Sequence, residues 1–113
     1  MVDSFVFGGY DPTNSKTFKD IHVLSLPGFV WTRIDATSGG GRSGHACVAT
    51  GNRQMITIGG IDYYHETPWE DVDPFAQGLA IFDMTELKWK NHYDHKAAAY
   101  DSPKPVQDWY ADG

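Results

Sequence analysis

One segment of the sequence, residues 61–77, concentrates side chains that could contact a ligand. Its aromatic, histidine and acidic residues lie within a few positions of one another, and they are Tyr63, Tyr64, His65, Glu66, Trp69, Glu70, Asp71 and Asp73. Aromatic rings can stack on sugar rings, and carboxylates accept hydrogen bonds from hydroxyl groups. Residues 61–77 are therefore our candidate ligand loop, with a protein or glycan as the expected partner.

Two other interpretations of this loop stay open at the level of sequence. Carboxylate oxygens are ligands that Ca²⁺ prefers, but the 12-residue EF-hand pattern is absent. A solvated acidic loop, held against the rest of the molecule by Trp69 and Phe75, is the plainer alternative. The loop is long for a compact fold, and loops of that kind are often functional.

Recognised catalytic motifs are absent from the sequence. It contains no Ser-His-Asp or H-E-x-x-H arrangement and no phosphate-binding loop before a helix. The run Gly39-Gly40-Gly41 precedes an expected strand, so we interpret it as a turn. We accordingly predict no catalytic residue, no metal site and no cofactor, and a non-catalytic protein.

His45 and Cys47 are two further residues with reactive side chains. A single cysteine excludes an internal disulfide and C-x-x-C metal sites. We expect Cys47 to be a small buried apolar residue. For His45, at the start of the same expected strand, packing or hydrogen bonding is favoured over metal ligation.

Composition excludes several classes of protein. The 113 residues carry a net charge of −6 with scattered lysines and arginines, so a nucleic-acid surface and contact with an anionic membrane are both disfavoured. The sequence has no run of 18 apolar residues that could form a transmembrane helix, and its beginning does not resemble a signal peptide. The high aromatic content favours strands.

An internal repeat organises the elements that must position the candidate ligand loop. Gly8-Gly9 recurs 51 positions later as Gly59-Gly60, while Val23 and Trp31 recur 58 positions later as Ile81 and Trp89. The extra residues fall in one loop, which spans 10–20 in the first copy and 61–77 in the second. Such periods are typical of repeat architectures.

Short β-branched and aromatic segments bounded by turn residues predict strands throughout. From residue 43 onward we expect strands at 45–50, 54–58, 79–84 and 87–93, which form a four-stranded antiparallel meander. The first copy supplies only the last three strands of such a unit. No window shows helical periodicity flanked by caps.

At these residues the chain resembles the kelch repeat. The motif consists of a strand ending in Gly-Gly, a hairpin ending in a Trp strand, and an Arg-x-Gly-His turn that opens the next unit. The matching residues are Gly8, Gly9, Gly59, Gly60, Trp31, Trp89, Arg42, Gly44 and His45. The period of about 50 residues and the four-stranded unit are those of a kelch propeller blade.

We interpret the motif residues as structural. Gly-Gly lets a neighbouring backbone approach closely, a Trp ring fills the space between adjacent sheets, and Arg42 can donate to backbone carbonyls between blades. The predicted fold is an all-β partial propeller of about two blades. Residues 1–40 are the last three strands of one blade, 41–95 a complete blade, and 96–113 a tail leading toward a further blade or closing strand.

Residues 59–113 also resemble fungal kelch or galactose-oxidase-like proteins anchored in the plasma membrane or cell wall. This resemblance implies an extracellular scaffold, with the anchor outside this segment. Two alternatives remain, a copper enzyme fragment of the galactose-oxidase kind and a cytosolic kelch adaptor. For the copper enzyme, no stretch matches that family's ligand motifs residue by residue.

Overall fold

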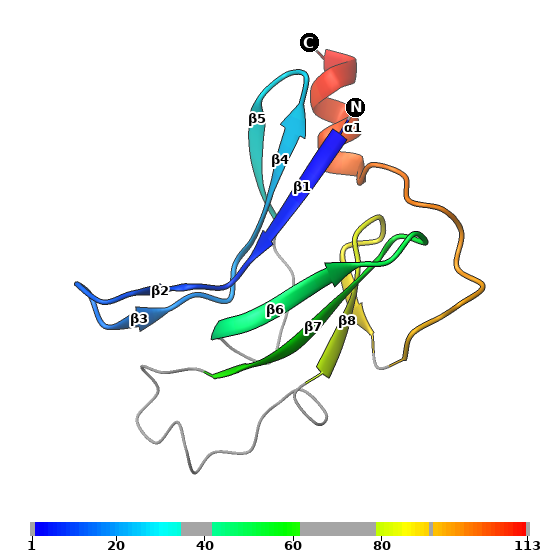
Figure 1. Ribbon diagram of the computed structural model, residues 1–113. Coiled ribbons are helices and arrows are strands. Elements are labelled where there is room, and N and C mark those ends of the chain that lie inside the picture. The colour runs from blue at the N-terminus through cyan, green and yellow to red at the C-terminus, as the bar shows by residue number, and fades with distance from the viewer. Residues whose placement is uncertain (1, 35–41, 62–78, 91, 113) are drawn as a thin grey trace.

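The computed structural model describes residues 2–34, 42–61, 79–90 and 92–112, and its strands form three antiparallel sheets (Figure 1). The elements, in chain order, are β1 (Val2–Phe7), β2 (Tyr10–Asp11), β3 (Lys16–Thr17), β4 (Ile21–Leu26), β5 (Val30–Ile34), β6 (Ser43–Ala49), β7 (Gln54–Ile61), β8 (Leu79–Asp83), β9 (Lys88–Lys90) and α1 (Lys104–Asp112). The described residues thus confirm the predicted all-β class, with none of the three sheets closed on itself.

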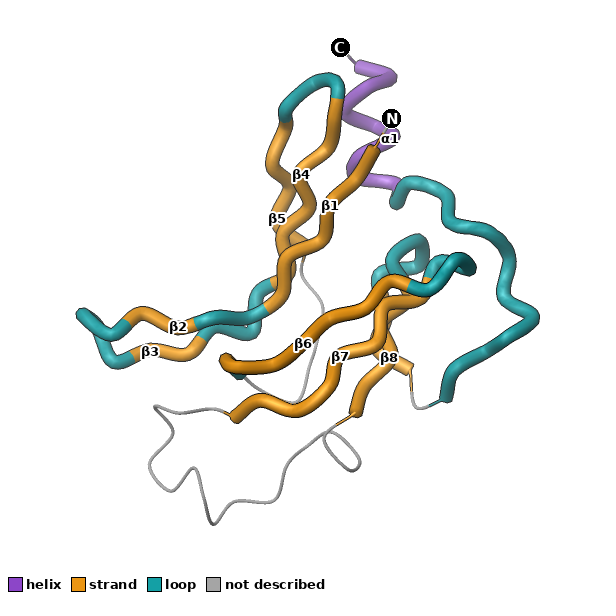
Figure 2. The backbone as a smooth tube through the Cα atoms, in the orientation of Figure 1, coloured by secondary structure: helices purple, strands orange, loops and turns teal. Residues whose placement is uncertain are grey.

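The first sheet has the strand order β1-β4-β5. Along β4 the burial alternates, so that Ile21, Val23 and Ser25 are buried while the residues between them are partly exposed. This alternation follows from the two-residue period of a strand, which sends successive side chains to opposite faces. The short β2–β3 hairpin extends from the end where β1 finishes and β4 begins (Figure 2).

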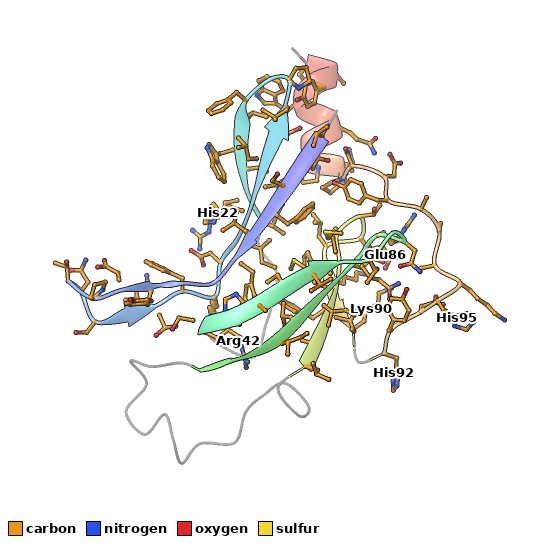
Figure 3. All side chains as sticks on the ribbon, viewed as in Figure 1. His22, Arg42, Glu86, Lys90, His92 and His95 are labelled. Carbon is orange, nitrogen blue, oxygen red and sulfur yellow. The ribbon has the colours of Figure 1, made fainter. Side chains whose placement is uncertain are left out.

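The second sheet is a four-stranded meander with the order β6-β7-β8-β9. Its strands fall where the sequence predicts them, with ends that differ by a few residues. The β8–β9 turn is held by Asp83, whose Oδ1 accepts hydrogen bonds from the backbone N–H of Thr85 and Glu86. Lys90 Nζ lies 3.0 Å from Glu86 and 3.6 Å from Asp83 across the same turn (Figure 3).

The two larger sheets pack face to face, and the core lies between them. The buried apolar residues of this core are Phe7, Ile21, Val23, Ile34, Met55, Phe82 and Val106. Aromatic rings cross the interface, with the Phe7 centroid 5.0 Å from that of Trp89 and the Phe5 centroid 6.4 Å from that of Phe82. Burial of these large apolar side chains is the main stabilising contribution.

Helix α1 corrects the prediction of strands throughout. The tail after β9 runs along the second sheet and returns to the first, where α1 packs against the β4–β5 hairpin (Figure 1). Its Val106 is fully buried in the core, and the hydroxyl of Tyr110 contacts Ser25 Oγ and the Gly28 backbone N–H, each at 3.1 Å. Residues 104–112 are therefore helical, where the sequence analysis predicted no helix.

Candidate functional site

The candidate ligand loop falls almost entirely outside the described residues, which stop at Ile61 and resume at Leu79. All eight of its candidate side chains, including Tyr63 and Trp69, lie in that interval. The strands that flank it are β7 and β8, which correspond in the repeat to β1 and β4. The loop thus leaves the second sheet at the end equivalent to the one where the β2–β3 hairpin leaves the first.

One glycine of each Gly-Gly pair, Gly8 or Gly60, lies close against the segment that carries Arg42, Ser43 and His45. A Cβ atom added to Gly8 would stand 2.5 Å from the Arg42 carbonyl oxygen and 2.7 Å from His45 Cε1. One added to Gly60 would stand 2.8 Å from the Ser43 carbonyl oxygen. Both glycines also have positive φ, so they meet the two conditions that favour glycine over other residues.

Arg42 and His45 connect the first sheet to the second. The Arg42 backbone donates to the Phe18 carbonyl (3.1 Å) and accepts from the Gly9 N–H (2.9 Å), both in the first repeat. Its buried guanidinium donates to the Gly59 carbonyl at the end of β7 (Figure 3). His45 Nε2 lies 2.8 Å from the Phe7 carbonyl oxygen, so a hydrogen bond crosses from β6 to β1.

The two tryptophans of the repeat have different surroundings. Trp89 is partly buried and makes edge contacts with Phe7 and Phe82, with ring centroids 5.0 and 5.1 Å apart. Trp31, at the equivalent position in the first sheet, is 55% exposed. The same residue type thus packs between sheets in one copy and lies on an uncovered face in the other.

Asp3 and the tail form a polar contact that the sequence did not predict. Asp3 Oδ2 accepts hydrogen bonds from the Tyr100 hydroxyl (2.5 Å) and from Ser102 Oγ (2.6 Å). Burial raises the pKa of Asp3, but hydrogen bonds from Ser102 and Tyr100 outweigh that effect and hold the pKa below its usual value. Burial and the nearby Asp3 carboxylate raise the pKa of Tyr100.

Gln54 supplies a second polar contact to the tail. Its fully buried side chain donates from Nε2 to the Asp94 carbonyl and accepts at Oε1 from the Asp94 N–H, each at 2.7 Å. This paired arrangement satisfies both ends of the amide. The sequence signal for this contact is a Gln at the start of an apolar strand. That signal does not identify Asp94 as the partner of Gln54.

A cavity of about 470 Å³ lies between the start of β1 and the end of β6. It is lined by Asp3, Ser4, Phe5, Cys47, Ala49, Thr50, Gly51, Arg53, Met55, Met84 and Tyr100. Cys47 is exposed on β6, so the expectation of a buried cysteine was wrong. Neighbouring atoms still desolvate the thiol enough to raise its pKa, which makes the reactive thiolate scarcer.

Within the described residues, no group of three or more His, Cys, Asp or Glu side chains is arranged to hold a metal ion. A search of the same residues finds no helix with the length and apolar character needed to cross a membrane.

The chain is similar in sequence to a kelch repeat-containing protein of Arthroderma benhamiae, with 32% identity over an alignment of 97 positions that covers 79% of this chain. It is also similar to acyl-CoA-binding domain-containing proteins 5 and 4 of Arabidopsis thaliana, at 30% identity over 77% and 88% of this chain. No family model matches. The chain spans only 12–13% of the length of these relatives. Most of the length of this chain is thus similar in sequence to a fungal kelch-repeat protein. The antiparallel sheets of the chain are consistent with kelch-like blades.

Proposed function

We propose that the chain is a segment of a kelch-type propeller that serves as a non-catalytic binding scaffold. In this assignment residues 1–40 are the last three strands of one blade and residues 41–95 are the complete blade that follows. The support comes from the repeat, from the three- and four-stranded sheets that pack face to face, and from the similarity to a fungal kelch-repeat protein.

The exposure of equivalent residues carries this proposal. Phe7 and Ile21 of the first sheet are buried against the second, whereas their counterparts Ile58 and Leu79 are 46% and 45% exposed on its outer face. Trp31 is exposed in the same manner on the outer face of the first sheet. The outer face of each sheet thus exposes residues whose counterparts in the other copy of the repeat are buried between the two sheets. This is the arrangement expected of units that stack in series.

The binding function is assigned to the candidate ligand loop, since the repeat residues have structural contacts. Its mixture of aromatic and acidic residues suits a glycan or protein ligand. By resemblance to anchored fungal kelch proteins, we place the whole protein at the outer face of the plasma membrane or in the cell wall. A cytosolic kelch adaptor is the alternative location, and an upstream signal peptide in the full gene would exclude it.

A galactose-oxidase-like copper enzyme is the competing function. Such a centre uses Tyr and His ligands with a Cys that is cross-linked to one Tyr. In this chain Cys47 and Tyr100 line the same cavity. The described residues contain no cluster of side chains that could hold a metal ion. Stoichiometric copper and a tyrosyl-radical spectrum in the full protein would overturn the scaffold assignment.

Glycan binding by the full protein tests the candidate ligand loop. We expect binding on a glycan array to fall at least about tenfold in a Tyr64→Ala/Trp69→Ala variant, because each aromatic ring that stacks on a ligand ring contributes on the order of 1 kcal/mol. Phe29→Ala, which changes an exposed aromatic in the β4–β5 turn at the other end of the first sheet, is the matched control and should bind normally. Equal loss in both variants, or no loss in the loop variant, would contradict the assignment.

A further inference from the structure

Three consecutive residues of the tail bind both sheets where the tail crosses from the second sheet to the first (Figure 1). The Tyr100 hydroxyl and Ser102 Oγ donate to the Asp3 carboxylate at the start of β1. Between them, the Asp101 carbonyl accepts from Thr85 Oγ1 (2.6 Å), and the Asp101 N–H donates to the same oxygen (3.1 Å). Thr85 lies in the β8–β9 turn, so this short segment connects the first sheet to the second.

Helix α1 continues this connection along the first sheet. Gln107 Nε2 donates to the Ser102 carbonyl (2.5 Å), which attaches the helix to the segment before it. One turn of the helix further on, the Tyr110 hydroxyl accepts from the Gly28 N–H at the tip of the β4–β5 hairpin. The contact at the start of β1 and the contact at the hairpin tip are therefore joined through a single hydrogen-bonded body.

Residues 100–112 depend on the sheets for their structure, whereas the sheets have other contacts with each other. Val106 is the member of the buried apolar core that these residues supply, and the strands supply the rest. At the other end of β1, His45 bonds to the Phe7 carbonyl and the Arg42 backbone bonds to the first repeat. Segments with few buried apolar contacts open at a lower free energy than the core.

We propose that residues 100–112 form a clasp, a cooperative unit that opens and closes while the two sheets stay packed. Tyr100 is also a wall of the cavity between β1 and β6, and its ring meets that of Phe5 edge-on with centroids 6.1 Å apart. Opening removes this wall and takes both donors away from the Asp3 carboxylate. The clasp thus controls access to the Asp3 end of the cavity.

The amide of Gly28 reports the state of the clasp, because its partner Tyr110 lies at the opposite end of the clasp from Asp3. Hydrogen exchange of this amide is measured by NMR in dilute solution. Tyr100→Phe removes a donor to Asp3 and keeps the aromatic ring. The matched control is Tyr93→Phe, which removes a tail hydroxyl that bonds to the β6–β7 turn, outside the clasp.

We expect the Gly28 amide to exchange at least about tenfold faster in Tyr100→Phe, because loss of a hydrogen bond to a charged acceptor shifts the whole clasp toward its open state. In Tyr93→Phe it should exchange as in the original chain. The amides of β7, which pairs on both sides, should keep their protection in both variants.

An unchanged Gly28 rate in Tyr100→Phe would overturn the inference, because the two ends of the clasp would then open independently. Equal acceleration of the Gly28 and β7 amides would also overturn it, since the clasp would then open only together with the sheets. Neither result bears on the candidate ligand loop, which the glycan measurement tests separately.

Discussion

At the scale of single residues, the chain relies on polar contacts that join segments far apart in the sequence. Asp3 lies at the start of β1, yet its carboxylate accepts hydrogen bonds from Tyr100 and Ser102 in the tail. Hydrogen bonds to a charged acceptor are stronger than neutral ones. This contact therefore fixes the tail to the first sheet just before α1 begins.

This contact predicts a loss of stability at both ends of the pH range. The pKa of Asp3 is lowered in the folded state, so its contribution is present above the unfolded value of about 4 and is lost as the pH falls further. The pKa of Tyr100 is raised, so its contribution is present below about 10 and is lost as the pH rises. Urea unfolding across pH should show both losses.

Substitutions assign these losses to the two side chains. Asp3→Asn should flatten the acid limb of the stability curve, and Tyr100→Phe should flatten the alkaline limb. Asp112→Asn changes an exposed carboxylate of α1 and should leave both limbs as they are. An acid limb that is equally steep in Asp3→Asn would show that other carboxylates cause it.

At the scale of elements, the strands were predictable because their signals are local. The Gly-Gly pairs and Asp83 mark the ends of strands, and the two Trp residues mark the last strand of each sheet. The repeat then sets the order of the strands. Helix α1 was missed although Val106, Trp109 and Tyr110 have helical spacing and Pro103 and Pro105 suit a first turn. Nine residues make an unstable helix in isolation, and its stability comes from packing on β4 and β5, which no local pattern reveals.

The candidate site shows the same division. The Gly-Gly pairs and Arg42 were identified from the motif, since their roles depend on backbone geometry that recurs with the repeat. Cys47 was expected to be buried because cysteine usually is, but β6 is the end strand of its sheet and Cys47 lines the cavity between β6 and β1, where it is exposed. The contacts of Asp3 and Gln54 join positions more than 30 apart, beyond the reach of a local pattern.

The docking of α1 can be tested at Val106. Val106→Ala should reduce the free energy of unfolding by about 2 kcal/mol, because it removes buried methyl groups and leaves a cavity. Asp108→Ala, on the exposed side of the same helix, removes only the ion pair to Lys104 and should cost less than about 0.5 kcal/mol. Urea denaturation measures both, and equal costs would contradict the packing of α1 on the core.

At the scale of the whole molecule, the two outer faces should fit each other. The Trp31 face of the first sheet corresponds to the face of the second that is buried against β1, while the Ile58 face corresponds to the buried face of the first. A copy of the chain can therefore add to another copy in the way the second sheet adds to the first. Such head-to-tail contacts close into rings or continue as open assemblies.

We therefore expect the chain, expressed alone, to self-associate with rising concentration in sedimentation velocity. Trp31→Arg and Ile58→Lys each place a charge on one face and should each reduce the assembly, since burying an unpaired charge is unfavourable. A mixture of the two variants retains one pair of matching faces, so it should form dimers and nothing larger. Tyr10→Lys, which changes an exposed aromatic outside both faces, should associate like the original chain. A monomer at every concentration with a sharp reversible melt, or dimers in each variant alone, would show that the two faces do not recognise each other.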